Sequence, residues 1–283
     1  MGRISEAKER VIDMKKKIYL YGFIPSEELD KASLPEHEGF DETEDIFTLP
    51  VDSITAIVSQ LDPDAYTEEV IEDKINNDLD WLQKKAYHHH EILMLLNQRY
   101  TAIPLSFCTI YNNEESLLET ISIQAADLLD TFKEITGKEE WNLKIFYDEK
   151  KLKKQVHENN PVIKQKQEEL KELSPGKQFF ERKKIDKLAA KKMEKELNDR
   201  CGKIHDELAA MAVQADIKKT LGKDATGRKD NMSWNSVYLL EDSEVEGFVA
   251  EVMKIEKKLG ESGLNMEATG PWPVYHFSSL AKA

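Results

Sequence analysis

The stretch Gly270-Pro271-Trp272-Pro273-Val274-Tyr275-His276-Phe277, near the end of the chain, places two prolines around a tryptophan. Proline fixes the backbone φ angle and has no amide hydrogen to donate, so it does not fit the interior of a sheet. We therefore expect this stretch to leave a sheet edge and to lay its aromatic rings over a hydrophobic core. Together with the apolar run TAIPLSFCTI at 101–110, it indicates architecture rather than chemistry.

Two strand–helix–strand units are expected before this stretch. The first has a strand at 103–110, a helix at 114–135 that stops at Gly137, and a strand at 141–147. The second has a strand at 233–240, a helix at 243–259 capped by Ser243 and stopped by Gly260, and a strand at 264–270. Two such units in one domain predict a split βαβ, ferredoxin-like arrangement, with both helices on one face of an antiparallel sheet.

A long segment at about 149–230 separates these two units and must fold into structure of its own. After the turn at Ser174-Pro175-Gly176, the sequence predicts a long helix over 179–218. Its seam has heptad spacing, at Leu197, Cys201, Ile204, Leu208, Met211 and Ala215. The partner of the seam is the helical segment 160–173, the sheet of the same domain, or another protein; we expect it within this chain. A mobile loop is expected at 220–230.

The N-terminal part reads as strands at 17–24 and 53–61, a short strand at 45–51, and a helix at 77–99. One face of that helix carries Leu79, Leu82, Ala86, Tyr87, His90, Leu93, Leu96 and Asn97. The fold class predicted is α+β with two domains. These are an N-terminal α/β domain at 1–100 and a modified ferredoxin-like domain at 101–283 with a helical insertion at about 149–230.

Composition narrows the function classes. The 283 residues carry a net charge of −14, unevenly distributed: 27–80 totals −16 and 150–230 totals +8. Because acids are mixed into the basic segment, we expect solvated helix faces and no nucleic-acid partner. The apolar runs are shorter than the roughly 20 residues of a membrane helix, and the N-terminal sequence lacks an apolar signal centre, so we expect a cytoplasmic protein without a membrane partner. Cys108 and Cys201 are expected to be buried reduced thiols.

The enzyme hypothesis depends on His88-His89-His90-Glu91. Consecutive helix positions point about 100° apart, so three adjacent histidines do not meet one metal ion. We expect His90 to be a core or interdomain histidine and His88 and His89 to be half exposed. Asp78 and Asp80 suit a helix N-terminus. Phosphate-loop, dinucleotide, nucleophile-elbow and zinc-finger patterns are missing, and Ser174-Pro175-Gly176-Lys177 reads as a plain helix start. We therefore expect no catalytic residue, no metal and no cofactor.

Several elements, in their order along the chain, resemble the gas vesicle protein F/L family. The residues that carry the resemblance are Tyr21, Gly22, Trp81, His90, Pro104, Leu105, Phe107, Gly270, Pro271, Trp272, Pro273, Tyr275 and Phe277. The resemblance runs from about Lys17 to Phe277, and its closing segment is the most specific part. The chain departs from the family pattern at Ser106, at Val274 and at Cys108, where glycine is usual.

The resemblance implies a non-enzymatic accessory protein that binds the apolar major gas vesicle shell protein and assists assembly or nucleation. A soluble protein that covers an apolar surface reversibly keeps such a subunit from aggregating. The docking site implied is an apolar groove, where the helical insertion meets the sheet or where the domains meet. Two alternatives stay open. One is a scaffold that links other gas vesicle accessory proteins through the basic helices, and the other is a metal-dependent enzyme at His88–His90.

Overall fold

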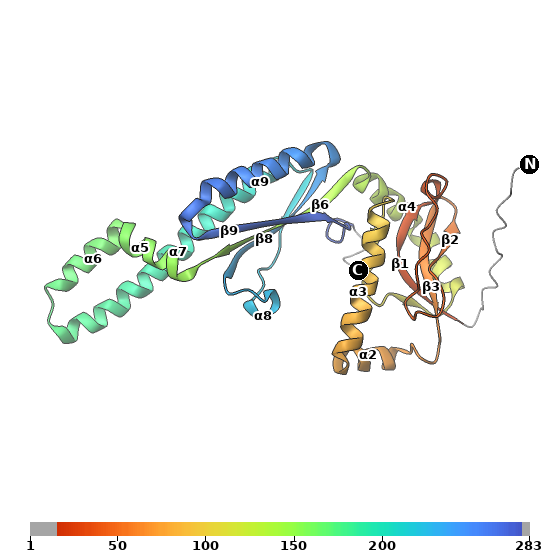
Figure 1. Ribbon diagram of the computed structural model, residues 1–283, viewed down its shortest axis with the longest axis horizontal. Helices are drawn as coiled ribbons and strands as arrows, with labels where there is room; N and C mark the ends of the chain where they lie inside the picture. The colour runs from red at the N-terminus through yellow and green to blue at the C-terminus, as the bar shows by residue number, and fades with distance from the viewer. Residues whose placement is uncertain (1–15, 279–283) are drawn as a thin grey trace, which may run out of the picture. The chain divides into compact units, whose positions relative to one another are not determined.

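The computed structural model describes residues 16–278, which form two compact units (Figure 1). Of the described residues, the first unit contains 16–137 and 272–278, and the second contains Lys138–Pro271. The chain therefore divides after Gly137 and again after Pro271, whereas the sequence placed one boundary after residue 100. The closing Trp272 to Ser278 segment returns to the first unit.

The sheet of the first unit is built on β1 (Lys17–Pro25), whose partners are all antiparallel. The strand order is β2 (Phe47–Val51), β3 (Ile54–Leu61), β1, β4 (Ile103–Pro104), and β5 (Ile110–Tyr111) also pairs with β1. Every residue of β3 is buried, which suits its Ile- and Val-rich sequence ITAIVSQL. The strands at the N-terminus are close to those predicted.

Four helices accompany this sheet: α1 (Ser26–Leu29), α2 (Glu68–Asn77), α3 (Leu79–Asn97) and α4 (Glu114–Ile135). Helix α4 has the bounds predicted from the sequence, and Gly137 follows it with φ of 69°. Helix α3 packs on the face of β1 that carries Tyr19 and Tyr21. Helix α2 was not predicted, because it buries no residue and its sequence is mostly polar.

The expected strand at 103–110 is wrong. The segment forms two short strands, β4 and β5, with a turn at Phe107-Cys108 between them, and both strands pair with β1. Helix α4 likewise packs against β1, β2 and β3. The predicted first strand–helix–strand unit is therefore wrong, because its first strand and its helix belong to the first unit, and its second strand, β6 (Lys138–Tyr147), belongs to the other sheet.

The second sheet has the strand order β7 (Gln214–Ile217), β8 (Asn231–Glu241), β6 (Lys138–Tyr147), β9 (Leu264–Trp272). Strand β8 is antiparallel to both β6 and β7, so β6 and β7 run in the same direction. Three helices, α5 (Glu149–Asn159), α6 (Pro161–Lys171) and α7 (Pro175–Ala209), join β6 to β7. Helix α8 (Lys223–Thr226) lies between β7 and β8, and α9 (Val245–Leu259) joins β8 to β9.

Helix α7 is the long helix that the heptad seam predicted. Its buried side chains are Ile185, Ala189, Met193, Leu197, Cys201, Ile204 and Leu208, and they join the core with residues of α5, α6, α9 and the sheet. The expectation that the seam packs within its own chain is confirmed. The helix ends at Ala209, however, and the last predicted seam residue, Ala215, lies in β7. The segment is therefore the connection between two strands of the sheet, and not an insertion between two complete halves.

Helices α5 and α6 and the first part of α7 extend beyond the end of the second sheet (Figure 1). We call α5, α6 and residues 175–195 of α7 the helical arm. Asn160 starts α6 by accepting hydrogen bonds from the amides of Val162 and Ile163, and Pro161 occupies the first turn, where a missing amide hydrogen costs nothing. Within residues 16–278, no helix is long and apolar enough to cross a membrane.

Candidate functional site

The family-signature residues are distributed over both units, most of them in the first. Tyr21 and Gly22 lie in β1, Trp81 and His90 in α3, Pro104 in β4, Leu105 and Phe107 in the loop after it, and Trp272, Pro273, Tyr275 and Phe277 in the closing segment. Gly270 and Pro271 lie in β9 of the second unit. A Cβ at Gly22 would lie 2.6 Å from the Ile103 carbonyl oxygen, and one at Gly270 would lie 2.6 Å from the Trp141 ring, so both positions need glycine.

Each of the three consecutive histidines of α3 bonds a different tyrosine hydroxyl. Tyr21 Oη lies 3.0 Å from His88 Nε2, and Tyr19 Oη lies 2.8 Å from His89 Nδ1. On the third side of the helix, Tyr275 Oη lies 2.8 Å from His90 Nδ1. Because adjacent helix positions point in different directions, the three tyrosines come from two alternate positions of β1 and from the closing segment. We call these six side chains the histidine–tyrosine network.

The surroundings of His89 define its tautomer and its charge. The amide of Cys108 donates to Tyr19 Oη at 3.1 Å, so the Tyr19 hydroxyl is free to donate to His89 Nδ1. The Nε2–H of His89 then donates to the Leu105 carbonyl oxygen at 3.2 Å, which satisfies both ring nitrogens of a neutral imidazole. Burial is the main cause that lowers the pKa of His89 to about 4.

His88 and His90 are half-buried, but His89 is 5% exposed. The expected exposure is therefore wrong for His89, and the predicted apolar face of α3 is wrong in part, because Leu79 and Tyr87 are exposed. The buried residues are Lys85, His89, Ile92, Leu93 and Leu96. The sequence does not show this face as an apolar stripe, because Lys85 and His89 are polar. Their hydrogen-bond partners lie in distant segments of the chain.

Lys85 is the second polar residue of that buried face. Its ammonium donates to the Phe40 carbonyl oxygen and to Glu42 Oε1, the latter at 2.9 Å. Hydrogen bonds from Lys84 and Lys85 lower the pKa of Glu42 to about 2. A buried lysine needs such partners, because an unpaired buried charge is strongly unfavourable.

Cys108 occupies a left-handed backbone conformation, with φ of 63°, in the turn between β4 and β5. This conformation favours glycine, which is the residue expected at this position in the family pattern. Burial raises the pKa of the Cys108 thiol to about 11, so the thiol is protonated at neutral pH and is a poor nucleophile.

Within residues 16–278, no group of three or more metal-ligating side chains is placed to hold a metal ion. The hydrogen bonds between the three histidines and the three tyrosines give the network a structural use, which is to hold α3 and the closing segment in place.

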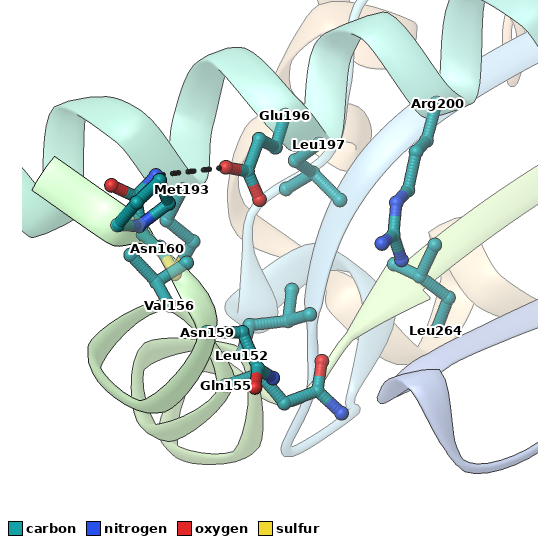
Figure 2. Close-up of a pocket in the computed structure, with 11 residues that line it drawn as sticks. Leu152, Gln155, Val156, Asn159, Asn160, Met193, Glu196, Leu197, Arg200 and Leu264 are labelled. Atoms are coloured by element: carbon teal, nitrogen blue, oxygen red, sulfur yellow. Dashed lines mark hydrogen bonds between the residues drawn. The ribbon is translucent and has the colours of Figure 1, made fainter. Parts of the chain in front are cut away.

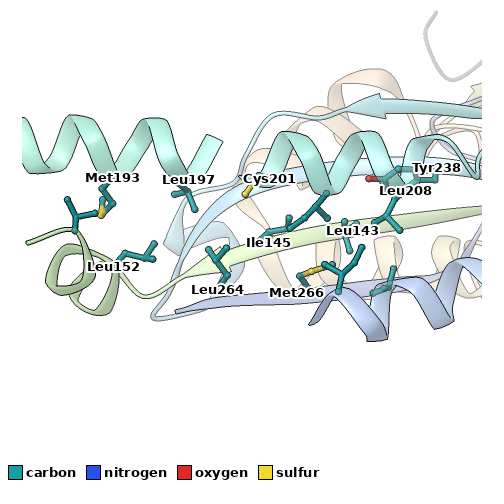
Figure 3. Packing of buried hydrophobic residues seen from close by; sticks show 14 of the residues in the cluster. Leu143, Ile145, Leu152, Met193, Leu197, Cys201, Leu208, Tyr238, Leu264 and Met266 are labelled. Carbon is teal, nitrogen blue, oxygen red and sulfur yellow. The ribbon is translucent and has the colours of Figure 1, made fainter. Parts of the chain in front are cut away.

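A cavity of about 260 Å³ lies in the second unit, where α5 and α7 meet the start of β9 (Figure 2). Its apolar wall is formed by Leu152, Val156, Met193, Leu197 and Leu264. Asn160, whose side-chain amide donates to Glu196 Oε1 at 3.3 Å, and Arg200 stand at its polar side. Figure 3 shows that Leu152, Met193, Leu197 and Leu264 continue the apolar core of the sheet into the arm. The cavity is therefore an apolar recess with a polar rim.

The protein is therefore of the α+β class, with two sheets. Hydrogen bonds between histidines and tyrosines support one sheet, and the long helix α7 supports the other. The family model described as gas vesicle synthesis protein GvpL/GvpF matches residues 17–279. The chain belongs to this family, which is a gas vesicle accessory family and not a known enzyme family.

Individual relatives agree with this assignment. Gas vesicle protein L of Streptomyces sp. (strain CB03234) is 20% identical over 205 residues, which are 72% of this chain and 73% of the relative. The crystal structure of GvpF from Anabaena sp. PCC7120 has a TM-score of 0.73 at 19% identity and covers 93% of this chain and 98% of its own. GvpF from Microcystis aeruginosa has a TM-score of 0.65 at 20% identity, with coverages of 93% and 99%. At these identities the two structures show that the fold is shared.

Proposed function

We propose that this protein is a gas vesicle accessory protein that binds the apolar major shell protein and assists gas vesicle assembly or nucleation. We further propose that it acts at the gas vesicle in the cytoplasm. The family provides the setting, and the observation that carries the proposal is the apolar recess between α5, α7 and β9. An unassembled shell subunit presents apolar surface that aggregates unless it is covered.

The recess suits one amphipathic segment of such a subunit. Leu152, Val156 and Leu197 provide apolar contact, and Arg200 and Gln155 at the rim suit the polar side of the same segment. This is the arrangement by which grooves receive amphipathic helices, with apolar anchors inside and polar groups outside. The recess lies where the helical connection meets the sheet, which is one of the two positions expected from the sequence.

The second unit also supports a fold proposal. We infer that it is a modified ferredoxin-like domain, with β6, α7, β7 as one half and β8, α9, β9 as the other. The strand order β7-β8-β6-β9 and the helical connection between strands running in the same direction support this assignment. In this arrangement α5 and α6 are the modification, because an ordinary connection needs one helix.

The test is co-expression with the major shell protein of the same organism, followed by a pull-down and an assay of the soluble fraction. Asn159 is exposed and lines the recess, so Asn159→Trp should block its mouth without replacing a buried residue. The neighbouring exposed Glu158 does not line it, so Glu158→Trp is the matched control. We expect the wild type and Glu158→Trp to hold shell protein in solution, and Asn159→Trp to lose at least about tenfold of the co-purified shell protein. Equal recovery with both variants would remove the recess from the proposal.

The scaffold alternative is favoured by the exposed basic residues of α7. It predicts a different result in the same experiment. The shell protein would stay insoluble with wild-type protein, while other gas vesicle accessory proteins would co-purify and would be lost when the arm is deleted.

A further inference from the structure

The helical arm exposes two adjacent phenylalanines. Phe179 is 56% exposed and Phe180 is 67% exposed, although both lie in the regular part of α7. Their ring centroids are 5.7 Å apart at an interplanar angle of 80°, so the two rings form one edge-to-face patch. Most large aromatic side chains are at least half-buried, and an exposed pair is typical of an interaction surface.

Positive charge surrounds this patch. Residues 175–195 contain eight Lys and Arg and three Asp and Glu, for a net charge of +5. The Lys183 ammonium lies 4.6 Å from the centroid of the Phe179 ring, and Lys177 and Arg182 are exposed beside it. The chemistry of the patch therefore selects a partner with an apolar recess and an acidic rim.

The first unit has a recess of this kind beneath α2. A cavity of about 720 Å³ is lined by Tyr66, Ile71, Ile75, Cys108 and Ile110, and Glu68 and Glu72 of α2 stand at its edge. Helix α2 carries four acids and one lysine, and within residues 16–278 none of its side chains is buried. Surface helices usually bury one apolar face. Among the described residues, the single cation of the lining is Lys17, whose ammonium donates to the Tyr66 carbonyl oxygen at 2.9 Å. We call this recess the α2 groove.

We propose that the Phe179–Phe180 patch of one copy docks in the α2 groove of a second copy of this chain. The two surfaces differ in shape and have opposite charge, so the contact is head-to-tail, and each pair of copies keeps one free patch and one free groove. Further copies therefore add head to tail. The two aromatic rings provide the apolar contact, and Lys183 and Arg182 face Glu68 and Glu72.

Sedimentation velocity of the full chain tests the contact. We expect the weight-average mass to exceed the 32.6 kDa of one copy, to rise with protein concentration at low salt, and to return to one copy at high salt. Phe179→Ala/Phe180→Ala and, separately, Glu68→Lys/Glu72→Lys should each raise the concentration for half-association at least about tenfold. Alanine keeps the helix propensity of α7, and circular dichroism verifies that each variant is folded.

Two control variants match these changes. Ile123→Ala/Met253→Ala removes two exposed apolar side chains elsewhere, and Glu115→Lys/Glu119→Lys reverses two exposed acids at the same spacing on α4. Both should associate like the wild type. Mixing the arm variant with the groove variant should restore association, but only to a 1:1 pair, because one partner keeps a groove and the other a patch.

Some results overturn the proposal. A mass that stays at one copy at every concentration means that the patch serves another protein or its own chain. Association that the control variants weaken equally means that any apolar or acidic surface suffices. Failure of the mixed variants to pair means that the patch and the groove are not each other's partners.

Discussion

Helices α3 and α7 support the two sheets in different ways. Helix α7 buries Ile, Ala, Met, Leu and Cys side chains along a regular seam, and one stripe of contacts joins it to α5, α9 and the sheet. Helix α3 buries Lys85 and His89 among its apolar residues and is held by hydrogen bonds to Phe40, Tyr19 and Leu105. The position of α7 is therefore set by buried apolar contacts, whereas the position of α3 is set by apolar contacts and by hydrogen bonds to polar partners.

The difference has an energetic consequence. An apolar seam is non-directional, so its stabilisation falls with the volume removed and does not depend on pH. A buried polar network is directional, and losing one partner leaves another group unsatisfied at a cost of about 1–3 kcal/mol. The two sheets should therefore respond differently to truncation and to acid.

The largest effect is expected from truncating the α7 seam. Leu208 is fully buried, and Leu208→Ala should lower the free energy of unfolding of the second unit by about 2–5 kcal/mol through lost contacts and a residual cavity. Hydrogen exchange followed by mass spectrometry should show faster exchange in β6 and β8. The matched variant Leu93→Ala, at a fully buried position of α3, should act on β1 and β3. Faster exchange in both sheets from either variant would contradict the separation of the two cores.

The second-largest effect is expected from acid, which should lower the stability of the first unit through His89. The pKa of His89 is about 4 in the folded protein, below its ordinary value of 6.5, so between these values the unfolded chain binds a proton that the folded chain does not. The contribution of neutral His89 to the free energy of unfolding should be fully present above about pH 6.5. It should be lost as the pH falls toward 4, and the loss should be at most roughly 3 kcal/mol. Urea denaturation at several pH values measures this slope.

His89→Asn should lower stability at neutral pH and flatten the acid slope, because the titrating group is gone. An unchanged slope in His89→Asn would assign the acid sensitivity to other groups.

The same contrast explains what can be predicted from the sequence. The seam from Leu197 to Leu208 and the helix at 114–135 follow from apolar spacing alone, so both are predicted correctly. The four residues of β7 are all exposed and show no alternation, and they become a strand only by pairing with β8. The burial of Lys85 and His89 depends on Phe40 and Tyr19, which lie far away in the sequence. Local patterns carry no signal for such long-range polar partners.

The role of the histidine triplet shows the same limit. The sequence indicates that His88, His89 and His90 point in different directions, which argues against one metal ion. It does not show that each histidine bonds a tyrosine hydroxyl, because Tyr19 and Tyr21 lie in β1 and Tyr275 lies 185 positions beyond His90. The sequence offers one signal for such partners, which is the spacing of Tyr19 and Tyr21. Alternate positions of a strand lie on the same face, so both hydroxyls can meet one helix.

The smallest effect is expected at the outer end of the network. Tyr275→Phe removes the hydroxyl 2.8 Å from His90 Nδ1 and keeps the ring that stacks on His90, so the free energy of unfolding should fall by about 0.5–1.5 kcal/mol. Limited proteolysis should cut the closing segment at 272–278 faster, while β6 and β8 stay protected. Tyr87 is exposed on α3, the helix that carries His90, so Tyr87→Phe controls for loss of a hydroxyl. It should change the free energy of unfolding by nearly zero. If Tyr275→Phe is equally silent, the ring contacts of Trp272 and Tyr275 with His90 hold the closing segment, and polar support is confined to the buried part of α3.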